Sequence, residues 1–292
     1  MQEAERPLQP IPEGVRISNA GEGYFRHMLK VVQPSSRLVP YVDGYVFARD
    51  QRGEHSGNPI RTVPRPGAVL TVNLGRPNRT ADGSATPVIS ILGVQTAARI
   101  WYSGEDTYLV MALLSPAGLA RLAGAAGGSL ADILLDLGSL IGDRATSELR
   151  DSASSMQSPV RALDAWLLTR LLNQRQAPDT RLVEAAFTVL ARVNRVGAAA
   201  ERLGVSRRHL SRVVSRHAGV SPKALIDLYR LERSVSAIQS GSRKSATGYA
   251  DQAHQIREWR KRLAITPGRY LREGRSVLAK SVTHETRFAF YL

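Results

Sequence analysis

The chain has 292 residues, 43% of them hydrophobic, and a formal net charge of +15. This length is enough for about two domains, and the hydrophobic content is enough for a sizeable core. It contains no cysteine, which excludes disulfides, thiolate zinc sites and cysteine nucleophiles. No apolar run approaches the ~18 residues of a membrane span, and the first residues lack the apolar segment of a signal peptide. We therefore expect a cytoplasmic protein without a membrane partner.

The positive charge is concentrated in the second part of the chain. Residues 181–292 hold 22 Lys and Arg against 8 Asp and Glu, whereas residues 1–180 hold 18 against 17. A basic segment joined to a near-neutral one is typical of a polyanion-binding module on a partner domain.

Short apolar stretches separated by turn signals run from Leu38 to Leu114, after a loose lead-in over residues 1–36. This pattern predicts a β-sandwich or a small barrel. The expected strands are 39–47, 68–74, 88–92, 99–102 and 108–114. Helices are expected from Pro116 onward, at 116–122, 129–137, 139–152 and from Pro159, where Leu163, Trp166, Leu167 and Leu171 recur at helical spacing. That stripe fits core packing, with a dimer surface as the alternative.

The N-terminal part offers no pattern of catalytic or metal-binding residues. The six histidines form no local pair, and neither a nucleophile elbow nor a glycine-rich phosphate loop is present. We expect no enzyme, no metal and no cofactor. Four side chains could line a small-molecule pocket, with aromatic filling of the core as the alternative: Tyr45, Arg99, Trp101 and Tyr102.

Residues 196–220 (VGAAAERLGVSRRHLSRVVSRHAGV) have the pattern of a helix-turn-helix. Gly204 suits the tight turn, and Ser206 stands where the N-cap of a second helix should be. That helix, Ser206–His217, buries one apolar stripe and exposes a polar face that suits guanine edges and phosphates. The polar face carries Arg207, Arg208, Ser211, Arg212 and Ser215. The alternative is an ordinary helical hairpin with a solvated basic face.

Five blocks in order resemble the AraC/XylS family of transcriptional regulators, over about residues 180–275. They are VSRRHLSR from Val205, AGVSPKA from Ala218, RLER from Arg230, GYADQ from Gly248 and TPGRYL from Thr266. The resemblance implies two helix-turn-helix units joined by a long helix, with two recognition helices in successive major grooves. The N-terminal half more loosely resembles the cupin-type sensor domains often joined to this family.

The second unit is placed by the same resemblance. Its recognition helix falls at about Asp251–Lys261, with Asp251 as N-cap. The side chains that it implies for DNA contact are Gln252, Ile256, Arg257 and Arg260, and Arg243 and Lys244 could add phosphate contacts.

Two departures from the family pattern affect this second unit. Residues 241–247 are polar where an apolar helix belongs, and Gln255 stands where a large apolar side chain belongs. Burying an unpaired amide costs about 1–3 kcal/mol. We therefore expect a truncated second unit with Trp259 as its main core anchor.

Together these features predict an α+β protein with a cupin-like β-barrel or sandwich, flanking helices and an all-α helix-turn-helix domain. The predicted divisions are 1–173 (sensing or dimerisation), 174–180 (linker), 181–275 (DNA binding) and 276–292 (extension). We expect a sequence-specific transcription regulator that binds double-stranded DNA through the Ser206–His217 helix. A small-molecule effector, a homodimer and, for an activator, RNA polymerase remain open as partners. The alternatives are a degenerate member that binds DNA weakly and acts through a protein partner, and a cupin-type enzyme fused to a DNA-binding module.

Overall fold

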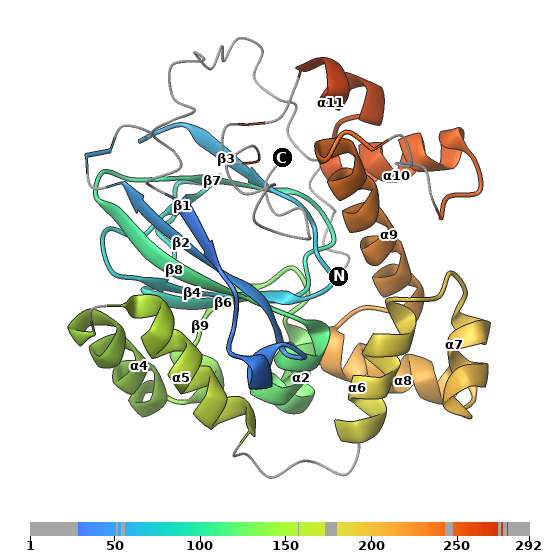
Figure 1. Ribbon diagram of the computed structural model, residues 1–292, viewed down its shortest axis with the longest axis horizontal. Coiled ribbons are helices and arrows are strands. Elements are labelled where there is room, and N and C mark those ends of the chain that lie inside the picture. The colour runs from blue at the N-terminus through green and yellow to red at the C-terminus, as the bar shows by residue number, and fades with distance from the viewer. Residues whose placement is uncertain are drawn as a thin grey trace, which may run out of the picture.

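The computed structural model describes residues 29–50, 52–53, 56–156, 158–172, 180–242, 248–273, 276 and 279. Residues 29–172, here the sheet half, carry the strands, and residues 180–273, here the helical half, carry helices (Figure 1). The predicted order, a sheet-rich N-terminal domain followed by a helical helix-turn-helix region, is confirmed. The predicted linker lies almost wholly outside the described residues.

The larger sheet of the described residues is six-stranded and antiparallel. Its strands, in spatial order, are β1 (Leu29–Val32), β2 (Val42–Asp50), β8 (Thr107–Leu114), β4 (Ala68–Asn73), β6 (Ile89–Leu92) and β9 (Leu134–Asp136). Alternate side chains of its central strands, such as Tyr45, Leu70 and Ala112, are buried in the main core.

A smaller, three-stranded sheet stands beside the larger one. It consists of β3 (Pro59–Thr62), β7 (Arg99–Tyr102) and β5 (Arg79–Thr80), with β7 in the centre. Because β3 and β5 pair with β7 and not with an edge of the larger sheet, the described strands form two open sheets. Of the two predicted architectures, a barrel or a sandwich, the closed barrel is not formed by the described strands.

Most expected strands lie where the sequence places them, but the expected helix 129–137 is wrong. That stretch follows a 3-10 helix, η3 (Gly124–Ser129), and then forms β9, which pairs with β6. A short apolar run does not by itself distinguish helix from strand, and here β6 offers an edge to pair with. The expected helix 139–152 is divided by Gly142, whose φ is 92°, into α3 (Gly138–Ile141) and α4 (Asp143–Ser155).

The helices of the sheet half cover the larger sheet (Figure 1). α4 and α5 (Pro159–Leu172) lie side by side below it, and η2 (Ser36–Leu38) precedes β2. Leu163, Leu167 and Leu171 of α5 are fully buried, so the predicted apolar stripe packs into the core. α2 (Pro116–Ala123) lies between this sheet and the helical half.

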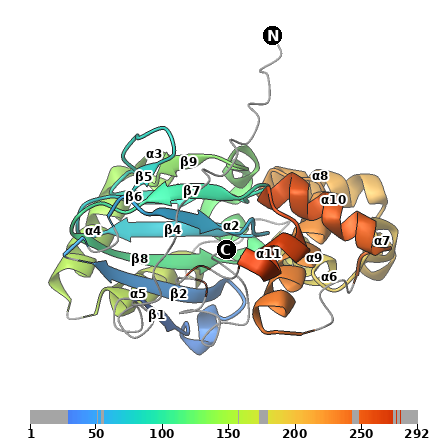
Figure 2. The same cartoon turned by 90° about the horizontal axis from the view of Figure 1, so that it is seen from above.

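The helical half packs directly against the sheet half (Figure 2). Its helices are α6 (Thr180–Leu190), α7 (Val196–Leu203), α8 (Arg207–Ala218), α9 (Pro222–Gln239), α10 (Gln252–Leu263) and α11 (Pro267–Glu273). One buried apolar cluster runs from the larger sheet through α2 into α6–α9. A second cluster joins Val63, which follows β3, to α9, α10 and Tyr270 of α11. None of the helices described here is long and apolar enough to cross a membrane.

Candidate nucleic-acid interface

The turn between α7 and α8 is built by its local sequence. Gly204 ends α7 in the left-handed region, with φ 64°, where a side chain would be strained. Ser206 then caps α8, since its hydroxyl accepts a hydrogen bond from the backbone N–H of His209 at 3.1 Å. Leu210 and Val214 are fully buried and Val213 nearly so, which confirms the predicted apolar stripe. The helix is thereby fixed with its polar face outward.

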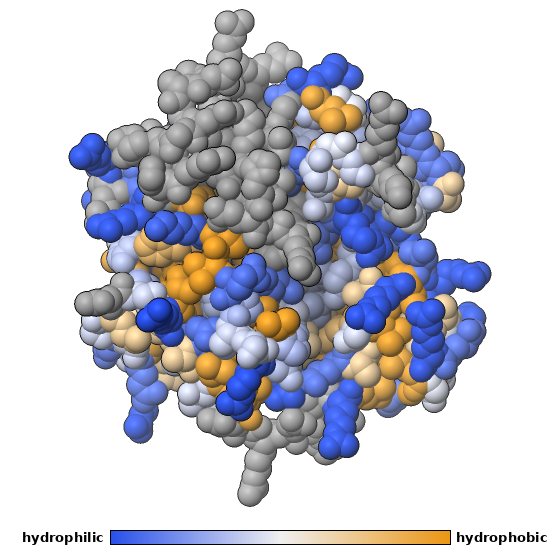
Figure 3. Space-filling model, in the orientation of Figure 1, coloured by the Kyte–Doolittle hydropathy of each residue, from blue (hydrophilic) through white to orange (hydrophobic). Residues whose placement is uncertain are grey.

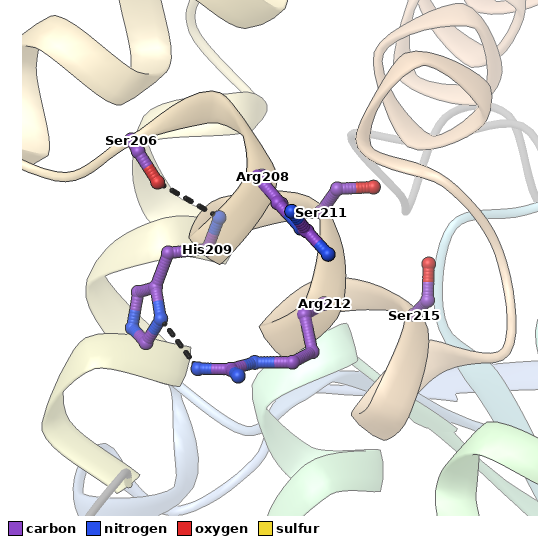
Figure 4. A pocket seen from close by; sticks show the side chains of 6 residues that line it. All are labelled: Ser206, Arg208, His209, Ser211, Arg212 and Ser215. Carbon is purple, nitrogen blue, oxygen red and sulfur yellow. Dashed lines mark hydrogen bonds between the residues drawn. The ribbon is translucent and has the colours of Figure 1, made fainter.

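The N-cap Ser206 and four of the five side chains predicted for the polar face gather in one open depression on α8 (Figure 4). It is lined by Ser206, Arg208, His209, Ser211, Arg212 and Ser215. Arg208 and Arg212 are both exposed, so their guanidinium groups can reach a ligand in front of the helix. Guanidinium groups and hydroxyls suit phosphate oxygens and guanine edges.

Arg207 lies apart from this cluster. A Cβ placed on Gly197 would come within 2.9 Å of Arg207 Nη2, so this guanidinium lies against the start of α7. It lines a neighbouring depression together with the turn residues Gly204 and Val205. Arg207 can still contact a phosphate beside α7, but it does not share the depression of Arg208 and Arg212.

His209 also belongs to the polar face of α8, although it was not among the side chains predicted for that face. Arg212 Nη2 donates a hydrogen bond to His209 Nδ1 at 2.9 Å (Figure 4). The two residues are three positions apart on one helix, a spacing that places side chains side by side. That spacing was the signal in the sequence that could have identified the pair.

The second predicted recognition helix is present in full as α10. Asp251 caps it, its carboxylate accepting a hydrogen bond from the N–H of His254 at 2.7 Å. Gln252, Arg257 and Arg260 are exposed and Ile256 is half-buried. Space-filling colours show hydrophilic side chains along the edge of the molecule that carries these helices (Figure 3). Residues 243–247, with the predicted phosphate contacts Arg243 and Lys244, lie outside the described part of the chain.

The core of the second unit matches the expectation for Gln255 and Trp259. Both side chains are buried, and both donate to the hydroxyl of Ser234 on α9, at 2.9 Å from Gln255 Nε2 and 3.1 Å from Trp259 Nε1. The buried amide is thus paired, which avoids the cost of an unsatisfied polar group. The predicted truncation concerns the helix before α10: the described residues between Gln239 and Gln252 contain no helix.

Comparison with known families identifies this part of the chain. Residues 199–273 match the family described as "Helix-turn-helix domain", a range that begins in α7 and ends with α11. This segment is an AraC-type helix-turn-helix domain. Such a domain supports a DNA-binding transcription regulator.

Solved structures similar to the chain include several of ToxT from Vibrio cholerae. An apo variant from strain SCE256 has 11% identity and a TM-score of 0.40, covering 78% of this chain and 96% of that one. ToxT from strain O395 has 13% identity and a TM-score of 0.36, covering 84% and 95%. Wild-type ToxT described as bound to an unsaturated fatty acid has 12% identity and a TM-score of 0.35, covering 84% and 93%. No curated protein matches the chain.

Outside the AraC-type domain, the four predicted pocket residues lie on two different sheets. Tyr45 of β2 is fully buried, and its hydroxyl donates to Asp164 Oδ1 at 2.9 Å, while burial raises its pKa. Trp101 Nε1 of β7 donates to Thr62 Oγ1 at 3.2 Å. Arg99, also on β7, donates to the carbonyl of Asp132, and burial lowers its pKa. These three side chains have partners within the sheet half, and the pocket of Tyr45, Arg99, Trp101 and Tyr102 stays a prediction.

Among the residues that the structure describes, no group of three or more His, Asp or Glu side chains is placed to hold a metal ion.

Proposed function

We propose that the chain is a sequence-specific transcription regulator that reads the DNA major groove with α8. The observation that carries the proposal is the cluster of Arg208, Arg212, Ser211 and Ser215 on the outward face of a capped helix in an AraC-type domain. The second helix of a helix-turn-helix is the one that lies in the major groove.

The chemistry of the cluster suits both parts of DNA recognition. A guanidinium can donate two parallel hydrogen bonds to the O6 and N7 of guanine, or hold a phosphate. Serine hydroxyls at Ser211 and Ser215 reach either bases or phosphates. The net charge of +14 over residues 181–292 supports an affinity dominated by phosphate contacts.

α10 extends the proposal to a second groove. It has the same length as α8, 12 residues, the same kind of polar N-cap, and exposed Arg257 and Arg260. We assign Gln252, Ile256, Arg257 and Arg260 to base or phosphate contacts, with Arg243 and Lys244 as phosphate contacts. Two reading helices on one chain would protect two successive grooves.

The first experiment is selection of bound sequences from random double-stranded DNA with the full chain, followed by footprinting on the selected site. Two protected grooves per protomer support reading by both helices. One protected groove favours the degenerate member that acts through a protein partner. No enrichment of any sequence over the starting pool would contradict the proposal.

Variants of α8 then test which side chains read the selected site. Arg208→Ala and Arg212→Ala should each weaken binding about 10- to 100-fold, since a bidentate base contact contributes about 1–3 kcal/mol. Arg144→Ala is the matched control, because Arg144 is 94% exposed on α4, at the far side of the molecule (Figure 1). Unchanged affinity and base preference in both α8 variants would remove α8 as the reader.

The remaining partners belong to the same proposal. We place the protein in the cytoplasm, where it would meet DNA, and assign sensing or dimerisation to residues 1–173, DNA binding to 181–275 and an extension to 276–292. A small-molecule effector would bind the N-terminal domain, and RNA polymerase would be a partner of an activator. Sedimentation of the full chain with and without selected DNA tests the homodimer.

A further inference from the structure

The two recognition helices are supported in different ways. α8 is preceded by α7, the partner helix of an ordinary helix-turn-helix, and packs against it. Before α10 the described residues 240–242 and 248–251 contain no helix. Within the described part of the chain, the support of α10 therefore comes from other elements.

α9 supplies part of that support. At the N-terminal end of α10, the ring of Tyr249 meets His254 edge-on, with centroids 5.4 Å apart, and lies 5.5 Å from the guanidinium of Arg230 on α9. In the middle of α10, Ser234 accepts from Gln255 and Trp259. These contacts fix the first turns of α10 but not its C-terminal end.

The C-terminal end of α10 is held by the sheet half. The last carbonyls of a helix have no partner within the helix. Here the N–H of Ala98 donates to the carbonyl of Arg262 at 2.7 Å, and Arg61 Nη2 donates to the carbonyl of Leu263 at 2.7 Å. In return, Arg262 Nη1 donates to the carbonyl of Thr96 at 2.9 Å.

Apolar packing and charge strengthen this attachment. Val63 of the sheet half is fully buried in one cluster with Trp259 and Leu263 of α10. Arg61 also places a positive charge at the negative end of the α10 dipole. Its side chain is half-buried, and burial lowers the pKa of its guanidinium.

We infer that the sheet half holds the C-terminal end of α10 in place, and that Arg61 is the positioning residue for α10. The orientation of the exposed side chains of Arg257 and Arg260 then depends on two residues that lie more than 150 positions earlier in the sequence, Arg61 and Ala98. This inference rests on the proposed function for what α10 reads, but not for how α10 is held.

The test is amide hydrogen exchange on the full chain without DNA. Arg61→Ala should raise exchange in the last turns of α10 about tenfold or more, because a hydrogen bond from a charged donor and its dipole interaction are lost. Arg61→Lys should recover part of the protection, since an ammonium can still donate to the Leu263 carbonyl. Amides of α8 should keep the exchange rates of the wild type.

Arg79→Ala is the matched control. Arg79 lies on β5 of the same small sheet and donates to the carbonyl of Gly83 in its own hairpin, far from α10. If Arg61→Ala raised exchange in α8 as much as in α10, or if Arg79→Ala acted like Arg61→Ala, the inference would be overturned. Should Arg61→Ala not fold, Arg61→Met, which keeps most of the aliphatic stem, is measured against the same criteria.

Footprinting separates this inference from the proposed function. On the selected site, the footprint of Arg61→Ala is compared with that of the wild type. The variant should lose protection in the groove of α10 and keep protection in the groove of α8. Retention of both grooves overturns the inference. If the wild type binds no DNA, the proposed function fails, whereas the exchange result still decides whether Arg61 positions α10.

Discussion

On the exposed face of α8, Arg212 donates a hydrogen bond from Nη2 to the ring Nδ1 of His209, 2.9 Å away. A guanidinium can only donate, so His209 Nδ1 is the acceptor in this pair. The other ring nitrogen, Nε2, is left for a contact on the face proposed to meet DNA. The pair also limits the rotamers of Arg212 before DNA binds.

The first prediction follows from this pair. His209→Phe keeps an aromatic ring but removes the acceptor, and should weaken binding to the selected DNA about 3- to 10-fold, as expected for one hydrogen bond. His209→Gln offers an amide oxygen to Arg212 and should lose less. Fluorescence anisotropy titrations at fixed salt measure both, and equal losses in the two variants would contradict the pairing.

A second prediction concerns the contact of α8 with the sheet half. A Cβ on Gly127 of η3 would lie 2.4 Å from the carbonyl oxygen of His217, and one on Gly128 would lie 2.5 Å from that of Arg216. Both clashes are with backbone, which yields little. Gly127→Ala should therefore lower the free energy of unfolding by about 1–3 kcal/mol, as measured by urea denaturation.

Gly268→Ala provides the control for this substitution. Gly268 lies on α11, and the nearest atom to an added Cβ is the flexible Arg272 Nη1 at 3.7 Å. The change should leave stability unaltered or raise it slightly, because alanine favours helix over glycine. A Gly127→Ala variant as stable as Gly268→Ala would show that α8 is not packed closely on η3.

The sequence predicts the AraC-type domain well because its signals are local. The caps Ser206 and Asp251 and the stripe around Leu210 each depend on residues within one or two turns. The burial of Gln255 likewise follows from its place in the helix pattern, whereas its pairing with Ser234 of α9 depends on a residue far away in the sequence. Local patterns therefore give the elements and the outward face of α8.

Features that depend on distant pairing were not predictable in this way. β9 becomes a strand because β6 lies beside it, and the local apolar run suits a helix equally well. Arg61 and Ala98 meet α10 only after the sheet half and α9 have packed together. The sequence likewise contains strands enough for a barrel, but their pairing into two open sheets is a long-range property.

A third prediction tests the polar centre of the second unit. Ser234→Ala removes the acceptor shared by Gln255 and Trp259, and should lower the free energy of unfolding by about 1–3 kcal/mol. Gln255→Leu restores the apolar residue of the family pattern. The double variant Ser234→Ala/Gln255→Leu should regain part of the loss, because fewer buried polar groups then need a partner.

A double-mutant cycle from urea denaturation measures this coupling. The matched control is Ser236→Ala on the same helix, at a half-buried position where no comparable hydrogen bond from α10 is described. It should change stability by less than Ser234→Ala. Strictly additive effects of Ser234→Ala and Gln255→Leu would mean that the two side chains are not energetically linked.

The fourth prediction concerns Glu232 of α9, which faces the sheet half. Burial raises the pKa of its carboxyl from 4.5 to about 7, and the negative charge of Asp43 adds to this, while Arg65 and Arg233 oppose it. Arg65 is fully buried and donates to Asp43 Oδ2 at 2.5 Å, and its positive charge also acts on Glu232.

Between pH 4.5 and about 7 the folded chain therefore holds a proton on Glu232 that the unfolded chain has lost. The contribution of Glu232 to the free energy of unfolding should therefore fall as the pH rises through this window, by an amount on the order of 3 kcal/mol, and stay level at higher pH. Glu232→Gln, which cannot ionise, should flatten this part of the profile and make the protein more stable than wild type at pH 8. Urea midpoints at pH 5, 6, 7 and 8 measure both effects, with Glu148→Gln on the exposed face of α4 as the control. The prediction is contradicted if the stability of the wild type rises from pH 5 to 7, or if the stability of Glu232→Gln depends on pH in the same way as that of the wild type. Either result would mean that Glu232 is ionised in the folded protein.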